Sequence, residues 1–272
     1  MDLIILSMDI FNYCLFLPIY TVSIWLVAKF LKVFDVSIAG MIFLSSWIFY
    51  SILSKLDNTL FALFVSLIVF LFLYMFIYFA IYDRLERDKT LVASFALFVL
   101  LVNTGIAIFS QETVILDIYV EPYLYISFVL LIFILLLFHK TSLWLKLKAF
   151  SDNPFKYALL GYSPTKLKLF TILTASVLNT LVILFLISLY GVSPLSSLYT
   201  FFDAAIPILF SGNAPPLILA LLSAIFAFIK VIVSMVIGDI WQPLITFGLI
   251  VILLTLRPYG LYKEIFREDM NA

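Results

Sequence analysis

The sequence predicts an all-α protein, a polytopic bundle of transmembrane helices with about eight or nine membrane elements. Of its 272 residues, 65% are hydrophobic and only 12% are charged. The mean hydropathy of +1.22 exceeds what a water-soluble domain carries, because a soluble surface needs polar cover. Uncharged apolar runs recur at about the 20-residue length of a membrane-crossing helix. We therefore expect residues 1–272 to form a single membrane domain.

Composition also limits the chemistry that the chain can support. The 16 basic and 16 acidic residues balance to a net charge of zero, which argues against nucleic-acid binding. One cysteine, Cys14, excludes an internal disulfide and a multi-cysteine metal site. The one histidine, His139, ends an apolar run beside Lys140, so we interpret it as an interfacial residue. Because no paired carboxylates or Ser/His constellation occurs at helical spacing, we expect no enzyme activity, catalytic residue, metal or cofactor.

The first five predicted spans follow five uncharged runs of the sequence. They cover residues 10–28, 36–54, 58–82, 90–111 and 122–138. Each run has about the length and the apolar content that a helix needs to cross the hydrocarbon core of a bilayer.

The later apolar runs must be divided. The run 169–202 is too long for one crossing and contains Gly191 and Pro194, which end helices. Gly212 and Pro216, with Pro215, divide the next run in the same way. The predicted elements of this part are 169–190, 195–211, 217–237 and 241–256.

The element 195–211 differs from the other predicted elements. It is short for a membrane crossing, and Asp203 and Pro207 interrupt its apolar character. We expect a broken or re-entrant segment there.

Lysine and arginine in the short loops predict the orientation. The loops 83–89 and 139–168 are rich in basic residues, whereas 111–121 holds acidic residues and no basic one. We place the first two loops in the cytoplasm and the third outside. The C-terminus is then inside with Arg257, Lys263 and Arg267, and nine elements put the N-terminus outside.

This layout predicts an inverted repeat with halves 10–111 and 169–256, joined by the linking span 122–138. Membrane carriers with such repeats bind substrate at interrupted elements in matching positions of the two halves. Val-Ser pairs at 36–37 and 192–193 open the second element of each half. The candidates for a substrate path near these elements are Ser37, Gly40, Asn179 and Ser193. The alternative is that Ser and Asn make hydrogen bonds between helices in the membrane.

The loop 139–168 contains a short predicted helix. Asn153 suits its N-cap, Pro154 its first helical position and Gly161 its left-handed stop. One face of the helix carries Phe155, Ala158 and Leu159. About two turns are not stable alone in water, so this helix must lie on lipid headgroups or dock on a cytoplasmic partner.

Four stretches of the chain resemble the branched-chain amino-acid ABC transporter permeases. The longest runs from Lys140 to Lys168 and is similar to the coupling-helix loop of that family. The others are Phe34-Asp-Val-Ser-Ile-Ala-Gly40, Tyr82-Asp-Arg-Leu-Glu-Arg87 and Leu256-Arg-Pro-Tyr-Gly-Leu261. The matches fall in the order of the family, and they do not separate it from the related permeases for urea, short amides and sugars. One departure is the turn at 209–216, where the family has a glycine-rich segment and this chain has one glycine and two prolines.

The resemblance implies the permease subunit of an ABC transporter in the cytoplasmic membrane of the cell, which moves a small polar solute such as a branched-chain amino acid. No Gly-Lys-Ser or Gly-Lys-Thr occurs, so ATP would be hydrolysed by a separate subunit. The implied partners, besides the lipid bilayer, are a second permease subunit, cytoplasmic ABC ATPases and an external solute-binding protein. The implied ATPase-coupling residues are Asp152, Asn153, Pro154, Phe155, Ala158, Leu159, Leu160 and Gly161.

Two other classes of function stay open. A secondary transporter buries ionisable residues within its spans, and the candidates here are Asp203, Lys230 and Asp239, each of which we expect near a span end. A membrane-embedded enzyme would need a catalytic constellation that the sequence does not show. An ATPase encoded beside this chain would favour the ABC permease over both.

Overall fold

The computed structural model describes residues 3–109, 121–140, 142–212 and 214–238, together with Trp241, Leu244, Gly248, Val251, Ile252 and Thr255. Apart from those six residues, the predicted span 241–256 lies outside the described part, as do Asp239, nearly all of the loop 111–121 and the basic residues after 256.

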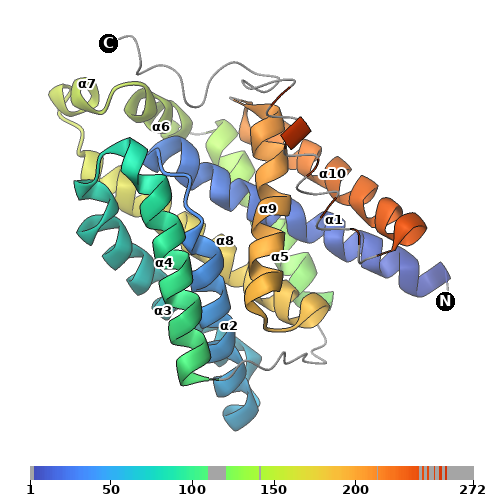
Figure 1. Cartoon of the computed structure of the whole chain (residues 1–272). Coiled ribbons are helices and arrows are strands. Elements are labelled where there is room, and N and C mark those ends of the chain that lie inside the picture. Colours follow the sequence, from blue (N-terminus) through green and yellow to red (C-terminus); the bar gives the residue numbers. More distant parts are fainter. Residues whose placement is uncertain are drawn as a thin grey trace. The chain divides into compact units, whose positions relative to one another are not determined.

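Helices make up nearly all of the secondary structure in the described part of the chain (Figure 1), besides the bridge residues Val192 and Gly212. They are α1 (Leu3–Leu26), the π-helical turn η1 (Val27–Leu31), α2 (Ser37–Leu56), α3 (Thr59–Ala80), the 3-10 turn η2 (Tyr82–Arg84), α4 (Arg87–Ile108), α5 (Glu121–Lys140), α6 (Ser142–Asp152), α7 (Pro154–Leu159), α8 (Pro164–Tyr190), α9 (Pro194–Ser211) and α10 (Pro216–Ile237). In the described part, six helices are long and apolar enough to cross a membrane, which indicates a multi-pass membrane protein.

The glycine positions confirm the predicted division of the later runs. Gly191, with φ of +73°, ends α8, and Gly212, with φ of +63°, follows the last residue of α9. The expectation of a broken helix at 195–211 is wrong, because α9 continues through Asp203 and Pro207 as one helix. A proline removes one backbone hydrogen bond, and neighbouring helices in a membrane protein can compensate for that loss.

The chain forms two compact units. Unit 1 comprises residues 1–22 and 199–272, and unit 2 comprises 23–198. Since one boundary falls inside α1 and another inside α9, both helices contribute to both units.

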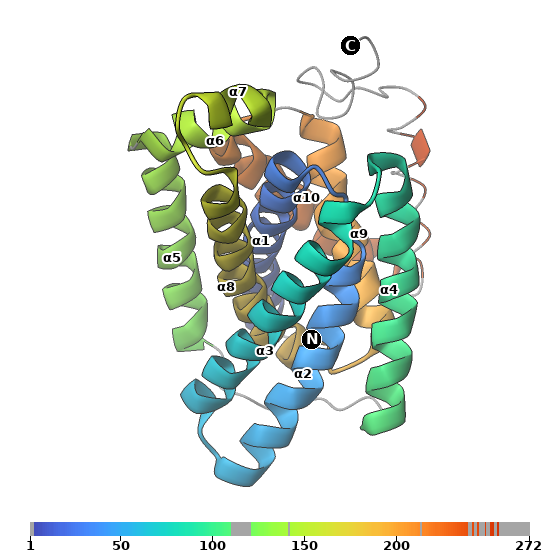
Figure 2. The ribbon, with the colours of Figure 1, turned by 90° about the vertical axis from the view of Figure 1, so that its left-hand side faces the viewer.

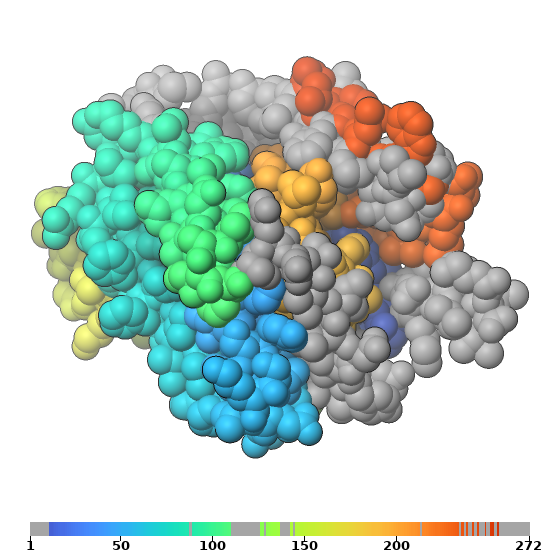
Figure 3. Space-filling view, turned by 60° about the horizontal axis from the view of Figure 1, so that its bottom comes forward, coloured from blue at the N-terminus to red at the C-terminus, as the bar shows by residue number. Residues whose placement is uncertain are grey.

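In unit 2, α2 and α8 are the central helices. α2 packs against α3, α4 and α8, and α8 also packs against η1. Two thirds of the apolar stretch of α2 is buried. In α4, only 22% of the apolar stretch is buried. The outer face of α3 and α4 remains apolar, with Phe72 and Val92 each more than 70% exposed. Figure 3 shows the side chains of α3 and α4 next to each other on this face, which suits contact with lipid tails.

In unit 1, α1 and α10 run antiparallel. The hydroxyls of Thr21 and Ser223 lie 2.8 Å apart, and the thiol of Cys14 approaches the carbonyl oxygen of Ala224 at 3.7 Å. Tyr20 of α1 meets Phe201 of α9 edge to face, with ring centroids 6.4 Å apart. Apolar packing thus surrounds the polar contacts of these three helices.

The short helices α6 and α7 lie at one end of unit 2, and the turn between α2 and α3 lies at its opposite end (Figure 2). α6 contacts η1, α5 and α7, and α7 also contacts α8. Because the bundle of unit 2 separates these ends, a membrane crossed by its helices would put them on opposite sides.

Candidate functional site

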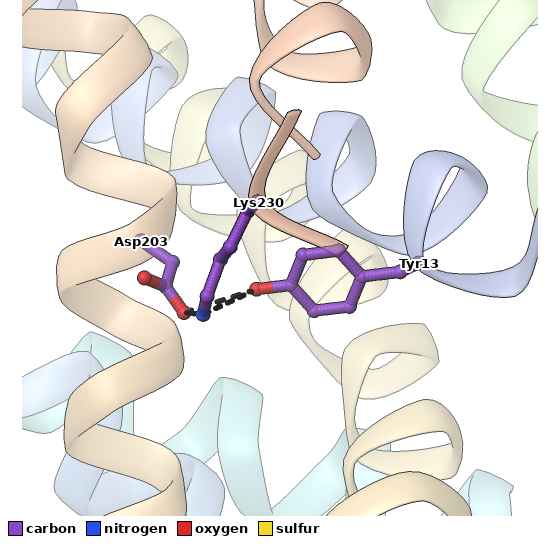
Figure 4. Close-up of polar contacts among 3 residues, drawn as sticks. All are labelled: Tyr13, Asp203 and Lys230. Carbon is purple, nitrogen blue, oxygen red and sulfur yellow. Dashed lines mark hydrogen bonds and ion pairs between the residues drawn. The ribbon is translucent and has the colours of Figure 1, made fainter. Parts of the chain in front are cut away.

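Three polar side chains from three different helices meet inside unit 1. Tyr13 comes from α1, Asp203 from α9 and Lys230 from α10, and Figure 4 shows them pointing toward one another. We call these three residues the Asp203 cluster. Each lies about two helical turns or more from either end of its helix. Asp203 lies near the middle of α9, which is not one of the six candidate spans, whereas Lys230 lies three residues before the end of the candidate span Pro216–Val233, as expected.

One carboxylate oxygen of Asp203 holds the cluster together. Its Oδ2 forms an ion pair with the ammonium group of Lys230. The same oxygen accepts a hydrogen bond from the hydroxyl of Tyr13 at 3.0 Å. Lys230 Nζ also donates to Tyr13 Oη at 3.1 Å and lies 5.2 Å from the centre of the Tyr13 ring. The phenol therefore contacts both charges through its hydroxyl and the cation through its π face as well.

The Asp203 cluster is shielded from solvent. The side chain of Asp203 is 2% exposed and that of Lys230 is 10% exposed. Removing two charges from water costs several kcal/mol for each ion, and close pairing offsets that cost only with good geometry. A charge without its partner would be far more costly there, so any state that separates Asp203 from Lys230 must supply a new partner for each.

A second cluster lies in unit 2, where the chain enters α2. Asp35 is fully buried in the loop before this helix, and its Oδ1 accepts three hydrogen bonds. The donors are the backbone N–H of Ser37 at 2.9 Å, the hydroxyl of Ser37 at 2.6 Å and the hydroxyl of Tyr82 at 2.6 Å. We call Asp35, Ser37 and Tyr82 the Asp35 cluster. The other carboxylate oxygen of Asp35, Oδ2, is buried without a hydrogen-bond partner.

Burial dominates the protonation of Asp35. It raises the pKa of this carboxyl to about 6, although the hydrogen bonds from Ser37 and Tyr82 act in the opposite direction. Hydrogen bonds from neutral donors favour the charged form but do not replace the solvation that water would give.

The predicted short helix forms with the predicted ends. The side chain of Asn153 accepts a hydrogen bond from Lys156 N at 2.9 Å, Pro154 occupies the first turn, and Gly161 has φ of +82°. Tyr157 is buried and stacks on Tyr162 with ring centroids 5.0 Å apart, so one side of α7 is anchored.

The opposite side of α7 is apolar and exposed. Phe155, Leu159 and Leu160 are each more than 70% exposed, and Ala158 between them is exposed too. We call these four residues the α7 surface. Lysines of the same region, Lys148, Lys156 and Lys166, are exposed as well.

The structure gives the four residues of the predicted substrate path different neighbours. Ser37 belongs to the Asp35 cluster, and Gly40 lies where α2 packs closely on α4. Asn179 accepts a hydrogen bond from Ser23 at 2.8 Å, which is a bond between two helices. The carbonyl of Ser193 accepts bonds from Ser197 N and Ser196 Oγ at the start of α9.

Sequence reasoning missed the partners of both clusters. Asp203 and Lys230 each stand alone in an apolar run, and this pattern identified them as candidate ionisable residues within spans. The pattern does not show that they contact Tyr13, which is 190 residues from Asp203 in the sequence. Asp35 carries a similar signal, because it is an acidic residue between two long apolar runs. Within the described residues, no group of three or more His, Cys, Asp or Glu is placed to hold a metal ion.

Comparisons of the chain with protein-family models, with curated proteins and with solved structures gave no significant match.

Proposed function

We propose that the chain is a multi-pass transporter that carries a small polar solute across the membrane and uses an ion gradient as its energy source. The observation that carries this proposal is the ion pair of Asp203 and Lys230, buried with Tyr13 between three helices. Ionisable side chains within membrane spans are costly and are typical of ion and substrate pathways in carriers and pumps.

The Asp203 cluster has the chemistry that a carrier needs to switch between two states. A proton on Asp203, or an anionic group of the solute beside Lys230, would replace one partner of the ion pair. The Tyr13 hydroxyl, which touches both charges, would remain as a donor or acceptor for the group that is left. Paired and separated states would then favour different arrangements of α9 and α10, and a ligand shifts such an equilibrium by binding one state better.

Transport by the chain alone tests this proposal. The purified protein is reconstituted in liposomes with no ATP and no ATPase, and counterflow of radiolabelled leucine, valine, urea and xylose is measured. We expect exchange of at least one of these solutes. If none is exchanged by protein that is inserted and folded, transport of this solute class by the chain alone is rejected.

A double neutral variant then separates a transport role of the cluster from a structural one. Asp203→Asn combined with Lys230→Met removes both charges together, so neither charge is left buried without its partner. We expect this variant to fold and its exchange rate to fall about tenfold or more. The matched control is Glu86→Gln with Lys89→Met, which removes an exposed ion pair with side chains 78% and 66% exposed. A normal exchange rate in the Asp203→Asn, Lys230→Met variant would show that the Asp203 cluster has a structural role only.

The α7 surface favours a second candidate, the permease subunit of an ABC transporter. Its exposed Phe155, Leu159 and Leu160, on a helix too short to be stable alone, suit a docking site for a cytoplasmic ATPase. In this second candidate, the chain has nine membrane elements and an inverted repeat of 10–111 and 169–256, and it lies in the cytoplasmic membrane. Its partners are a second permease subunit and an external solute-binding protein, and its solute is a branched-chain amino acid.

Ala158→Arg tests the second candidate. A long charged side chain on the α7 surface should abolish ATPase association and ATP-driven transport while membrane insertion stays intact, because α7 lies outside the candidate spans. Lys156→Ala, on the same helix, is the control that leaves the apolar side chains in place. ATPase association unchanged by Ala158→Arg would make α7 an interfacial anchor on the headgroups.

A further inference from the structure

We propose that Asp35 is a proton-binding site, at which Oδ2 takes up and releases one proton while Oδ1 keeps its hydrogen bonds to Ser37 and Tyr82.

The two oxygens of this carboxyl have opposite surroundings. Oδ1 accepts three hydrogen bonds of 2.6 to 2.9 Å, whereas Oδ2 is buried and accepts none. An ionised carboxylate spreads its charge over both oxygens, and a buried oxygen without a donor leaves half of that charge unstabilised. A proton on Oδ2 removes the charge and leaves Oδ1 as the acceptor that the network requires.

A second buried group without a partner stands near Asp35. The hydroxyl of Tyr74, in α3, is fully buried and has no hydrogen-bond partner, and its phenol interacts electrostatically with Asp35. A phenol hydroxyl can donate to an ionised carboxylate and accept from a protonated one. The Tyr74 hydroxyl makes no hydrogen bond to Oδ2 in this structure, so it adds a second buried polar atom without a partner near the carboxyl.

The ionisable groups around Asp35 supply no counterion for it. The described titratable side chains on the elements packed around it are Tyr50 and Lys55 of α2, Tyr74 and Tyr78 of α3, Tyr82, Asp83 and Arg84 of η2, Lys166, Lys168 and Tyr190 of α8, Lys29 and Lys32 before the loop, and Glu86 and Lys89 at the start of α4. Lys168 pairs with Asp83, and Lys89 pairs with Glu86. The groups that act on the protonation of Asp35, besides burial, are Ser37 and Tyr82, and both are neutral donors.

The direction of the pKa agrees with this geometry. Burial raises the pKa of Asp35 to about 6, so the carboxyl exchanges its proton near neutral pH rather than in acid.

A helix-capping role alone is the competing explanation. Asp35 accepts from the first N–H group of α2, and that bond uses Oδ1 only. A cap needs an acceptor and not a titrating proton, so the two explanations differ in whether Oδ2 exchanges a proton.

Infrared difference spectroscopy of the full chain in lipid nanodiscs tests the proposal. Between pH 4 and pH 8 the wild type should lose the C=O stretching band of one buried protonated carboxyl, and Asp35→Asn should lack that band at every pH. The matched control is Asp57→Asn, which alters an exposed aspartate at the end of α2 and should leave the band unchanged.

Tyr82→Phe gives an independent check if Asp35→Asn fails to fold. It removes one hydrogen bond that favours the charged carboxyl, so the midpoint of the band should rise by about one pH unit. No titrating band, a band that persists in Asp35→Asn, or a midpoint that Tyr82→Phe leaves in place would each overturn the proposal. Loss of the band on adding sodium at constant pH would overturn it too, because the ligand would then be a metal cation. These spectra measure protonation and not solute exchange, so failure here and failure of transport are separate results.

Discussion

The hydroxyl of Ser23 donates a hydrogen bond to the side-chain oxygen of Asn179 across 2.8 Å and thereby joins the last turn of α1 to the middle of α8. Both side chains are fully buried, and the same hydroxyl reaches the carbonyl oxygen of Ala175 at 3.2 Å. This bond gives Asn179 a structural role at a position that the sequence marks for a substrate path.

A double-mutant cycle of Ser23→Ala and Asn179→Ala should show a coupling of about 0.6 kcal/mol in the free energy of unfolding, a value typical of hydrogen bonds between membrane helices. Steric trapping in bicelles measures the free energy of unfolding of each variant. Ser51→Ala is the control, since the Ser51 hydroxyl donates to Trp47 O of its own helix. A coupling of zero would leave Asn179 available to a ligand.

Gly40 should tolerate alanine poorly and valine hardly at all. A Cβ atom at this position would lie 3.1 Å from Cβ of Leu101 and 3.2 Å from the carbonyl oxygen of Phe98, so α2 and α4 would have to separate. We expect Gly40→Val to lower the free energy of unfolding by about 1–3 kcal/mol, as overpacking of a tight interface does. Gly161→Ala is not a suitable control because of its positive φ, whereas Gly248 has open space around a Cβ and serves well. An unaffected stability in Gly40→Val would show that α2 and α4 pack less closely.

The two ends of unit 2 should differ in their access to a membrane-impermeant maleimide. In a Cys14→Ala background, Asp57→Cys probes the turn after α2 and Lys156→Cys probes α7, and both positions are exposed. With the basic loops in the cytoplasm, right-side-out vesicles should be labelled at 57 and not at 156. Labelling at both positions in intact vesicles would contradict the predicted orientation.

Stability should depend on pH through Asp35. Its pKa in the folded protein is raised from 3.8 to about 6, so the folded state binds the proton more tightly than the unfolded state. The stabilisation from protonated Asp35 is therefore complete below about pH 3.8, falls as pH rises, and is lost above about pH 6.

This pKa difference corresponds to about 3 kcal/mol. The free energy of unfolding of the wild type minus that of Asp35→Asn should fall by about that amount between pH 4 and pH 7. The difference is the quantity to follow, because other titrating groups contribute equally to both proteins. If this difference in the free energy of unfolding did not depend on pH, Asp35 would have the same protonation in the folded and the unfolded state.

Removing one charge of the Asp203 cluster should be worse than removing both. Asp203→Asn leaves the Lys230 ammonium buried beside Tyr13 only, and breaking a buried pair in this way costs about 3–5 kcal/mol. We expect Asp203→Asn alone to unfold at lower denaturant than the double neutral variant. Equal stability of the two would show that Lys230 can reach water when Asp203 is neutral.

Local features of the fold were predictable from the sequence, because hydropathy and helix termination act over short stretches. Apolar runs locate α2 to α5, α9 and α10 to within three residues, whereas α1 begins seven residues and α8 five residues before the predicted span. The glycines at 191 and 212 locate the breaks between the later helices. Asn153 and Gly161 delimit α7 for the same reason, since caps are local hydrogen-bonding and backbone preferences.

The side-chain pairings were not predictable, because nearly every face of these helices is apolar. In a soluble helix a polar stripe shows which side faces inward, but α3 and α4 are apolar on both their buried and their exposed sides. The position of Asp203 within α9 is clear from the sequence, whereas the face it shares with Tyr13 and Lys230 depends on how three helices rotate against one another.

α1 is synthesised long before α9 and α10, the two helices that it contacts in unit 1. Tyr13 leaves the ribosome 190 residues before Asp203, and at about 5–20 residues per second that separation corresponds to about 10–40 s. During this interval α1 sits in the membrane without α9 and α10, and its phenol must be satisfied by lipid headgroups, water or a chaperone. Lys230 follows Asp203 by 27 residues, so α9 enters the bilayer with its carboxyl before its cation exists. Tyr13 and Asp203 therefore lack their cationic partner until α10 has been synthesised.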